Sequence, residues 1–304
     1  MDDEAAGVLA LLPTLREGWP ALRPGSLREI RLRAGAPVQL IGEDGEWLSE
    51  SAVDAAWIGR AADALAAHSL YARDEELRQG YLSLADGSRA GVCGRLAAER
   101  GQIGRMTAIR SLCVRLARAR RGCADRWMPW LYEAGRPLGV LVLSPPGLGK
   151  TTLLRDIARQ FSTGTAWGRG VCVAVADERR ELSGSGHLDL GPRTDVMEDC
   201  PKAGAVAMLV RAMAPDVIVT DELGQAAEAE ALLEAARCGV KPAATAHARD
   251  LDAARGRRTL SRLLSAGLFE RIIVLSGGVG RVGGIYDGRG KQLYGGEDEP
   301  WTQA

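Results

Sequence analysis

A glycine-rich stretch followed by Lys150 and Thr151 occupies the middle of the 304-residue chain. The apolar run GVLVL (139–143) precedes it, and apolar residues at helical spacing follow it. Glycines at a strand-to-helix turn let successive backbone N–H groups point inward, toward phosphate oxygens. We therefore predict a phosphate-binding loop that consists of Ser144, Pro145, Pro146, Gly147, Leu148, Gly149, Lys150, Thr151 and Thr152.

Lys150 and Thr151 have the residue types and the order that binding of a nucleoside triphosphate requires. A lysine at this place reaches the β- and γ-phosphates, and the hydroxyl of the next residue ligates Mg²⁺. The pair therefore predicts ATP and Mg²⁺ as cofactors. Ser144 departs from the pattern GxxxxGK[ST], in which glycine usually holds the first position. The two later glycines are intact, so we expect the loop to form.

Carboxylates and one histidine follow three further apolar runs. Asp221 and Glu222 follow VIVT, Asp177 and Glu178 follow VCVAVA, and His247 follows AATA. The carboxyl ends of parallel strands open toward one ligand crevice. We therefore expect these side chains to lie beside the phosphate-binding loop.

The expected roles of these side chains differ. Asp221 would hold Mg²⁺ through water, and Glu222 would act as the base for an attacking water. Glu178 would polarise that water or assist with the metal, and His247 would sense the γ-phosphate through a hydrogen bond. The alternatives are an ordinary surface ion-pair cluster for Glu178 with its neighbours and a structural role for the histidine.

Arginines accumulate before the middle of the chain, among them Arg110, Arg115 and Arg118. In ring-shaped ATPases, a guanidinium from a neighbour or another domain often completes the site and raises the rate by about 10³ to 10⁵. Arg110 and Arg115 are our first candidates for this role, with Arg193 and Arg211 as further ones. A phosphate-binding patch for nucleic acid is the alternative reading of the arginine cluster.

Strands that alternate with helices are expected in the second half of the chain. Apolar runs at 139–143, 171–176, 217–220, 243–246 and 271–275 are separated by helical patterns, such as those at 204–213 and 226–237. Such alternation indicates a mostly parallel sheet covered on both faces. This α/β domain is expected over residues 136–304.

The first part of the chain has a different pattern. Residues 26–48 alternate apolar and polar side chains around turns, 52–68 are helical in period, and 81–95 form a second hairpin pattern closing at Asp86-Gly87. We predict a small α+β domain over residues 1–118. The arginine-rich and weakly periodic segment 119–135 is predicted to be a linker.

Composition limits the classes of partner. The chain has 39 Lys plus Arg against 39 Asp plus Glu, so it has no overall positive charge that would attract nucleic acid. We therefore expect no nucleic-acid partner. The six cysteines form no CxxC pair and are expected to be reduced, as in a cytosolic protein. Pro13 and Arg16 interrupt the apolar N-terminal stretch, so neither a signal peptide nor a span is expected there. We expect membrane contact only through partners.

Several longer segments carry a resemblance to a known family. They are IRLRAGAPVQLI (30–41), EELRQGYLSLADGSRAGVCG (75–94), IRSLCVRLARAR (109–120), PPGLGKTTLLRDIAR (145–159), DERRELSG (177–184), DVMEDCPKA (195–203) and MLVRAMAPDVIVTDELG (208–224). In these segments the chain resembles the stage III sporulation protein AA family, which itself is similar to the ATPases of type II secretion and type IV pili.

The resemblance implies a smaller N-terminal domain joined to a RecA-like P-loop NTPase core, assembled as a homo-hexamer. It also implies a cytoplasmic protein, peripheral at the mother-cell face of a membrane, which works with the membrane proteins of a channel linking mother cell to forespore in endospore formation. The family's functional positions match Lys150, Thr151, Glu178 and Glu222. Pro242, which lies at the start of the run before His247, is expected to weaken that strand as a hydrogen-bond donor and with it the assignment of the histidine.

Three functions are compatible with a P-loop and its acids. The first is a motor or assembly ATPase that couples hydrolysis to domain motion. The second is a P-loop kinase acting on a small molecule, against which the Asp221-Glu222 pair argues. The third is a RecA-type ATPase acting on DNA strands.

Overall fold

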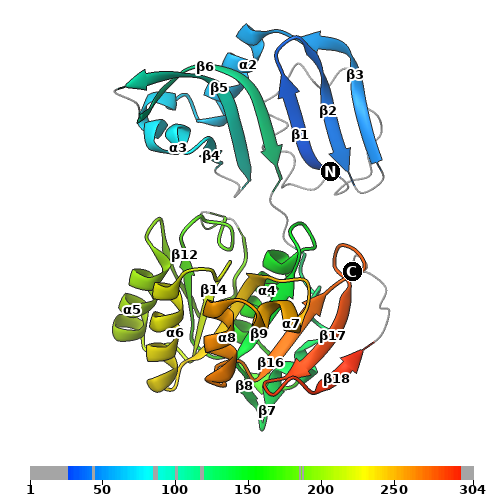
Figure 1. Ribbon diagram of the computed structural model, residues 1–304, viewed down its shortest axis with the longest axis vertical. Helices are drawn as coiled ribbons and strands as arrows, with labels where there is room; N and C mark the ends of the chain where they lie inside the picture. Colours follow the sequence, from blue (N-terminus) through cyan, green and yellow to red (C-terminus); the bar gives the residue numbers. More distant parts are fainter. Residues whose placement is uncertain are drawn as a thin grey trace. The chain divides into compact units, whose positions relative to one another are not determined.

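The computed structural model describes residues 27–42, 45–84, 88–99, 102–116, 120–184, 186 and 188–295 (Figure 1). The chain separates into two compact units: an N-terminal unit of residues 1–118 with 184–187, and a C-terminal unit of residues 119–183 with 188–304. The predicted turn at Asp86-Gly87 and the candidate Arg118 lie outside the described residues.

The N-terminal unit is built on a six-stranded antiparallel sheet with the order β3-β2-β1-β6-β5-β4. Alternate side chains of its strands, such as Ile30 and Leu32, are buried beneath helix α2, which is capped by Asp54. The arrangement agrees with the α+β fold predicted from the sequence. Its elements are β1 (Leu27–Arg33), β2 (Ala36–Gly42), β3 (Gly45–Val53), α2 (Ala55–Leu65), η2 (Leu70–Arg73), α3 (Asp74–Arg78), β4 (Tyr81–Ser83), β5 (Arg89–Glu99) and β6 (Gln102–Arg115).

The C-terminal unit contains an eight-stranded sheet with the order β13-β12-β14-β15-β9-β16-β17-β18. The first six strands in this order are parallel, and the last two continue the sheet antiparallel. The strands are β9 (Val140–Ser144), β12 (Val173–Asp177), β13 (Thr194–Glu198), β14 (Val217–Thr220), β15 (Lys241–His247), β16 (Arg271–Leu275), β17 (Val282–Asp287) and β18 (Gln292–Gly295).

Helices and short strands complete this unit. They are η3 (Met128–Leu131), β7 (Tyr132–Glu133), β8 (Arg136–Pro137), α4 (Lys150–Thr163), β10 (Gly164–Thr165), β11 (Gly168–Arg169), α5 (Lys202–Met213), α6 (Ala226–Arg237), α7 (Leu251–Arg255) and α8 (Arg258–Ser265). The mostly parallel sheet between helices confirms the predicted α/β fold class.

Both faces of the central strand β9 are buried, which explains its unbroken apolar run. Val140 and Val142 pack with α4 in one core, whereas Leu141 and Leu143 pack with α5, α6, α7 and α8 in the other. Side chains of a strand point alternately to its two faces, so a strand between two helical layers must be apolar throughout. Figure 1 shows α5, α6 and α8 together on one side of the sheet.

The predicted linker at 119–135 is corrected by the structure over much of its length. Cys123, Trp127 and Leu131 are buried in the core that contains α4. The backbone N–H of Ala124 donates to Oδ2 of Asp156 on α4 over 2.8 Å. Burial of these large apolar side chains makes the segment part of the C-terminal unit, because leaving them in water would be unfavourable.

Candidate active site

The predicted phosphate-binding loop joins the end of β9 to the start of α4, in the strand–loop–helix order expected from the sequence. Gly147 and Gly149 have φ values of 80° and 92°, in the left-handed region that side chains with a Cβ rarely adopt. Ser144, by contrast, is the last residue of strand β9, so the freedom of glycine is not required there. The backbone N–H of Gly280 donates to the carbonyl of Leu148 over 3.0 Å and braces the loop from the turn after β16.

Thr151 and Asp221, the two predicted magnesium ligands, are in direct contact. The Thr151 hydroxyl donates to Oδ2 of Asp221 over 2.6 Å. The other carboxylate oxygen of Asp221 accepts from the Thr245 hydroxyl and, over 2.9 Å, from the N–H of Glu222. Among the described residues, no cluster of three or more His, Cys, Asp or Glu side chains forms a metal site. The hydroxyl and carboxylate suit an ion whose remaining ligands are phosphate oxygens and water.

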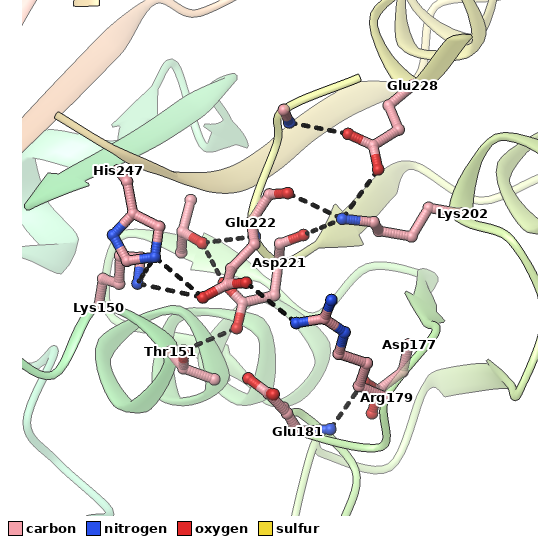
Figure 2. A network of polar contacts seen from close by, with 12 residues as sticks. Lys150, Thr151, Asp177, Arg179, Glu181, Lys202, Asp221, Glu222, Glu228 and His247 are labelled. Carbon is pink, nitrogen blue, oxygen red and sulfur yellow. Dashed lines mark hydrogen bonds and ion pairs between the residues drawn. The ribbon is translucent and has the colours of Figure 1, made fainter. Parts of the chain in front are cut away.

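Glu222 lies at the centre of the polar network shown in Figure 2. Its Oε1 is 3.1 Å from Nε2 of His247 and 3.6 Å from Nζ of Lys150, and its Oε2 is 3.5 Å from Nη1 of Arg179. Burial raises the pKa of Glu222, but Lys150, His247 and Arg179 together outweigh it and bring the pKa below the ordinary value. This carboxylate is therefore ionised at neutral pH.

His247 reaches the site from the carboxyl end of β15, where it pairs in register with Ser144. Its Nε2 is 3.3 Å from Nζ of Lys150. Pro242 is near the opposite end of the same strand, one residue before pairing with β9 begins. Its missing N–H therefore leaves the backbone around the histidine intact, and the expected weakening does not reach His247.

The acids after β12 divide between two roles. Asp177 is buried and accepts hydrogen bonds of 2.8–3.0 Å from the backbone N–H groups of Glu181, Leu182 and Ser183. Burial raises the pKa of Asp177, even though these hydrogen bonds lower it. Glu178 lines, together with Asp177, a cavity of about 200 Å³ whose wall also includes Glu222. Asp177 thus shapes the loop, while Glu178 lies at the same cavity as the predicted base.

The candidate arginines lie in several places. Arg110 and Arg115 are exposed on β6 of the N-terminal unit, and Nε of Arg115 is 3.6 Å from Oε2 of Glu29. Arg193 donates to the carbonyl of Ser162 over 2.8 Å and so covers the end of α4. Arg211 bonds within its own helix, to the carbonyl of Ala207. The contacts of Arg193 therefore indicate a structural role.

Comparison with known proteins places this chain in a family. The family described as sporulation stage III, protein AA matches residues 15–293. The chain belongs to that family. The stage III sporulation protein AA of Bacillus subtilis (strain 168) is 36% identical over 279 residues, which cover 88% of this chain and 89% of the relative.

Solved structures of secretion and pilus ATPases have a similar fold. The ATPase DotB of Legionella pneumophila matches with a TM-score of 0.56 and 17% identity, over 82% of this chain and 72% of that one. The pilus retraction motor PilT, solved with bound ADP, matches with a TM-score of 0.55 and 16% identity, over 83% and 75% of the two chains. At these identities the likeness shows the fold alone, a mostly parallel α/β core with an N-terminal antiparallel-sheet domain.

Three residues that contact the acids of the site were not predicted from the sequence. Thr245 donates to Asp221, Arg179 contacts Glu222, and Lys202 donates to the backbone carbonyls of both acids. The segment DVMEDCPKA, which includes Lys202, contributed to the resemblance but suggested no contact with the acids. No sequence motif predicts these three contacts, because each residue lies on a different element of the fold from the acid that it contacts.

Proposed function

We propose that this protein binds ATP with Mg²⁺ at residues 144–152 and hydrolyses it. The observation that carries the proposal is the convergence of Lys150, Thr151, Asp221, Glu222 and His247, from three neighbouring strand ends, in one network of contacts of 2.6–3.6 Å. A lysine, a hydroxyl, a metal-binding acid and a second acid are the groups that phosphoryl transfer to water uses.

Each group has one task in this proposal. Lys150 and the N–H groups of the loop hold the phosphates, and Thr151 with Asp221 holds the metal. When bound, Mg²⁺ neutralises charge that develops between the β- and γ-phosphates. Glu222, held ionised by its cationic neighbours, accepts the proton of the attacking water. His247 contacts both Lys150 and Glu222 and is suited to report on the γ-phosphate.

We further propose that hydrolysis serves a membrane channel between mother cell and forespore. Membership of the sporulation family supports this setting, and the fold shared with DotB and PilT supports a motor or assembly role. The working form would be a homo-hexamer at the cytoplasmic face of the membrane, in contact with membrane-protein partners. Among the described residues no helix is long and apolar enough to cross a bilayer. Arg110 and Arg115 are the proposed groups that complete the site of a neighbouring subunit.

The test compares the wild-type chain with Lys150→Ala. Titration with a fluorescent ATP analogue and Mg²⁺ should saturate for the wild type and weaken strongly for the variant. Phosphate release without any acceptor separates an ATPase from a kinase, and its independence of added DNA separates it from a DNA-linked ATPase. The mass of the particle in solution, measured with and without ATP and Mg²⁺, tests the proposed homo-hexamer. Absence of saturable, Lys150-dependent binding would overturn the proposal.

A further inference from the structure

Lys202, the first residue of α5, is largely but not fully buried beside the turn that carries Glu222. Its Nζ donates to the backbone carbonyls of Asp221 and Glu222, over 3.0 and 2.8 Å. The same nitrogen lies 2.9 Å from Oε1 of Glu228 (Figure 2). An ammonium has three protons, and these three acceptors use all of them. The side chain is 12% exposed, so its contacts are shielded from water.

Glu228 extends the contact to the other end of the same turn. Its Oε2 accepts from the backbone N–H groups of Gly224 and Gln225, over 2.8 and 2.9 Å. Its side chain is 6% exposed. The Lys202–Glu228 pair therefore bonds to the carbonyls at the start of the turn 221–225 and to the amides at its end. We call this pair with its four backbone contacts the turn clamp.

The turn needs such support because of the backbone of Glu222. Its φ is +50°, in the left-handed region that a residue with a Cβ enters only at an energetic cost. In this conformation its N–H donates to the Thr245 hydroxyl over 2.8 Å, and its carboxylate faces Lys150 and His247. Relaxation to the ordinary helical or extended region would turn the carboxylate away from both.

We propose that Lys202 is a positioning residue for hydrolysis, which acts through the turn clamp to keep the Glu222 carboxylate aimed at the attacking water. This inference rests on the proposed ATPase function. Within the part of the chain that the structure describes, the polar contacts of Lys202 are the three given above, and none is with the phosphate-binding loop. Its loss should therefore reduce turnover without weakening nucleotide binding.

The first variant is Lys202→Met, which keeps the length of the side chain and removes all three donors. We expect turnover to fall by about 10²-fold, the effect of a catalytic group misplaced by roughly 1 Å. The affinity for the fluorescent ATP analogue with Mg²⁺ should be as high as that of the wild type or higher, because a displaced Glu222 carboxylate no longer competes with the nucleotide for Lys150. This variant also leaves Glu228 buried without its partner, which lowers stability.

The double variant Lys202→Met, Glu228→Gln separates positioning from stability. It removes the unpaired buried carboxylate, so its melting temperature should return toward the wild-type value. Turnover should stay low, because the carbonyls of Asp221 and Glu222 still lack their donor. A pair that served stability alone would restore turnover together with the melting temperature.

Lys241→Met is the matched control. Lys241 also forms a lysine–glutamate pair, 2.8 Å from Glu270, but it lies at the opposite end of β15 from His247. Wild-type turnover is expected for this control. The inference is overturned if the double variant hydrolyses ATP at the wild-type rate, or if affinity falls in parallel with turnover. A wild-type chain without Lys150-dependent hydrolysis would instead overturn the proposed function itself, and the inference with it.

Discussion

Lys150 and Glu222 form an ion pair across the site, with Nζ and Oε1 3.6 Å apart. The lysine side chain is 7% exposed, and the glutamate side chain is 34% exposed. In the proposed reaction the same ammonium must hold the phosphates. The Glu222 carboxylate and the γ-phosphate would therefore compete for Lys150. Through this ion pair, nucleotide binding is coupled to the position of the proposed base.

The substitution Glu222→Gln tests the assignment of the base. We expect hydrolysis to fall by about 10² to 10⁴-fold, the usual contribution of a positioned base. ATP binding should be as tight as in the wild type or tighter, because Lys150 loses a competing anion. Phosphate release and fluorescent-nucleotide titration measure the two effects. Glu230→Gln, in an exposed pair with Arg262, is the control that should behave as the wild type. Unchanged hydrolysis in Glu222→Gln would remove this carboxylate from the mechanism.

The substitution Asp221→Asn tests the metal site. Asp221 accepts from Thr151, the predicted direct ligand, and should orient it or the water shell of the ion. We expect the Mg²⁺ concentration for half-maximal hydrolysis to rise by about 10 to 100-fold. Binding of ATP measured without Mg²⁺ should stay at the wild-type level, since Lys150 is untouched. The same Mg²⁺ dependence in variant and wild type would contradict the assignment.

The pH dependence of hydrolysis follows from the lowered pKa of Glu222. A base with a lowered pKa stays deprotonated to lower pH, so the midpoint of the acid limb of the pH–rate profile should lie below the ordinary glutamate pKa. Arg179 is one of the cations that lower this pKa, and its side chain is 56% exposed. Arg179→Gln should move the acid limb of the pH–rate profile to higher pH, by an amount that shrinks with added salt. An acid limb that stays in place, or moves to lower pH, would contradict the role of Arg179.

The substitution Leu131→Ala tests whether the segment at 123–132 belongs to the folded core. Leu131 is fully buried, and a leucine-to-alanine change at such a site costs about 2 to 5 kcal/mol of unfolding free energy. Leu48→Ala, at a side chain that is 54% exposed, is the control with a small effect. Denaturant unfolding of the full chain provides the comparison. If Leu131→Ala lowers the free energy of unfolding no more than Leu48→Ala does, the segment behaves as a linker and not as part of the core.

The substitutions Arg110→Ala and Arg115→Ala test the proposed completion of the site by a neighbour. Each should keep ATP binding, and at least one should lower turnover by up to about 10³-fold, as loss of an arginine that stabilises transferring phosphate does. Arg78→Ala, which breaks an exposed pair with Asp74 in the same unit, is the control. Steady-state hydrolysis at the wild-type rate in both variants would exclude the two arginines from the mechanism.

The sequence by itself determines the glycine-rich loop between strand and helix, the class of fold and the acids at the strand ends. These features are local: a strand, a glycine turn and a helix adjoin within 139–163, and Asp221 and Glu222 directly follow their strand. Residues that adjoin in sequence are held together by the backbone itself. Their spacing therefore carries the prediction.

Only the tertiary structure decides which acid faces Lys150 and what holds it there. Glu222, not Glu178, makes that contact, because β15 lies between β14 and β9 and brings His247 and Lys150 to the same carboxylate. Lys202 meets Glu222 only because α5 begins beside the end of β14. Such contacts depend on strand order and helix packing, which arise from burial over the whole unit and leave no fixed spacing in the chain.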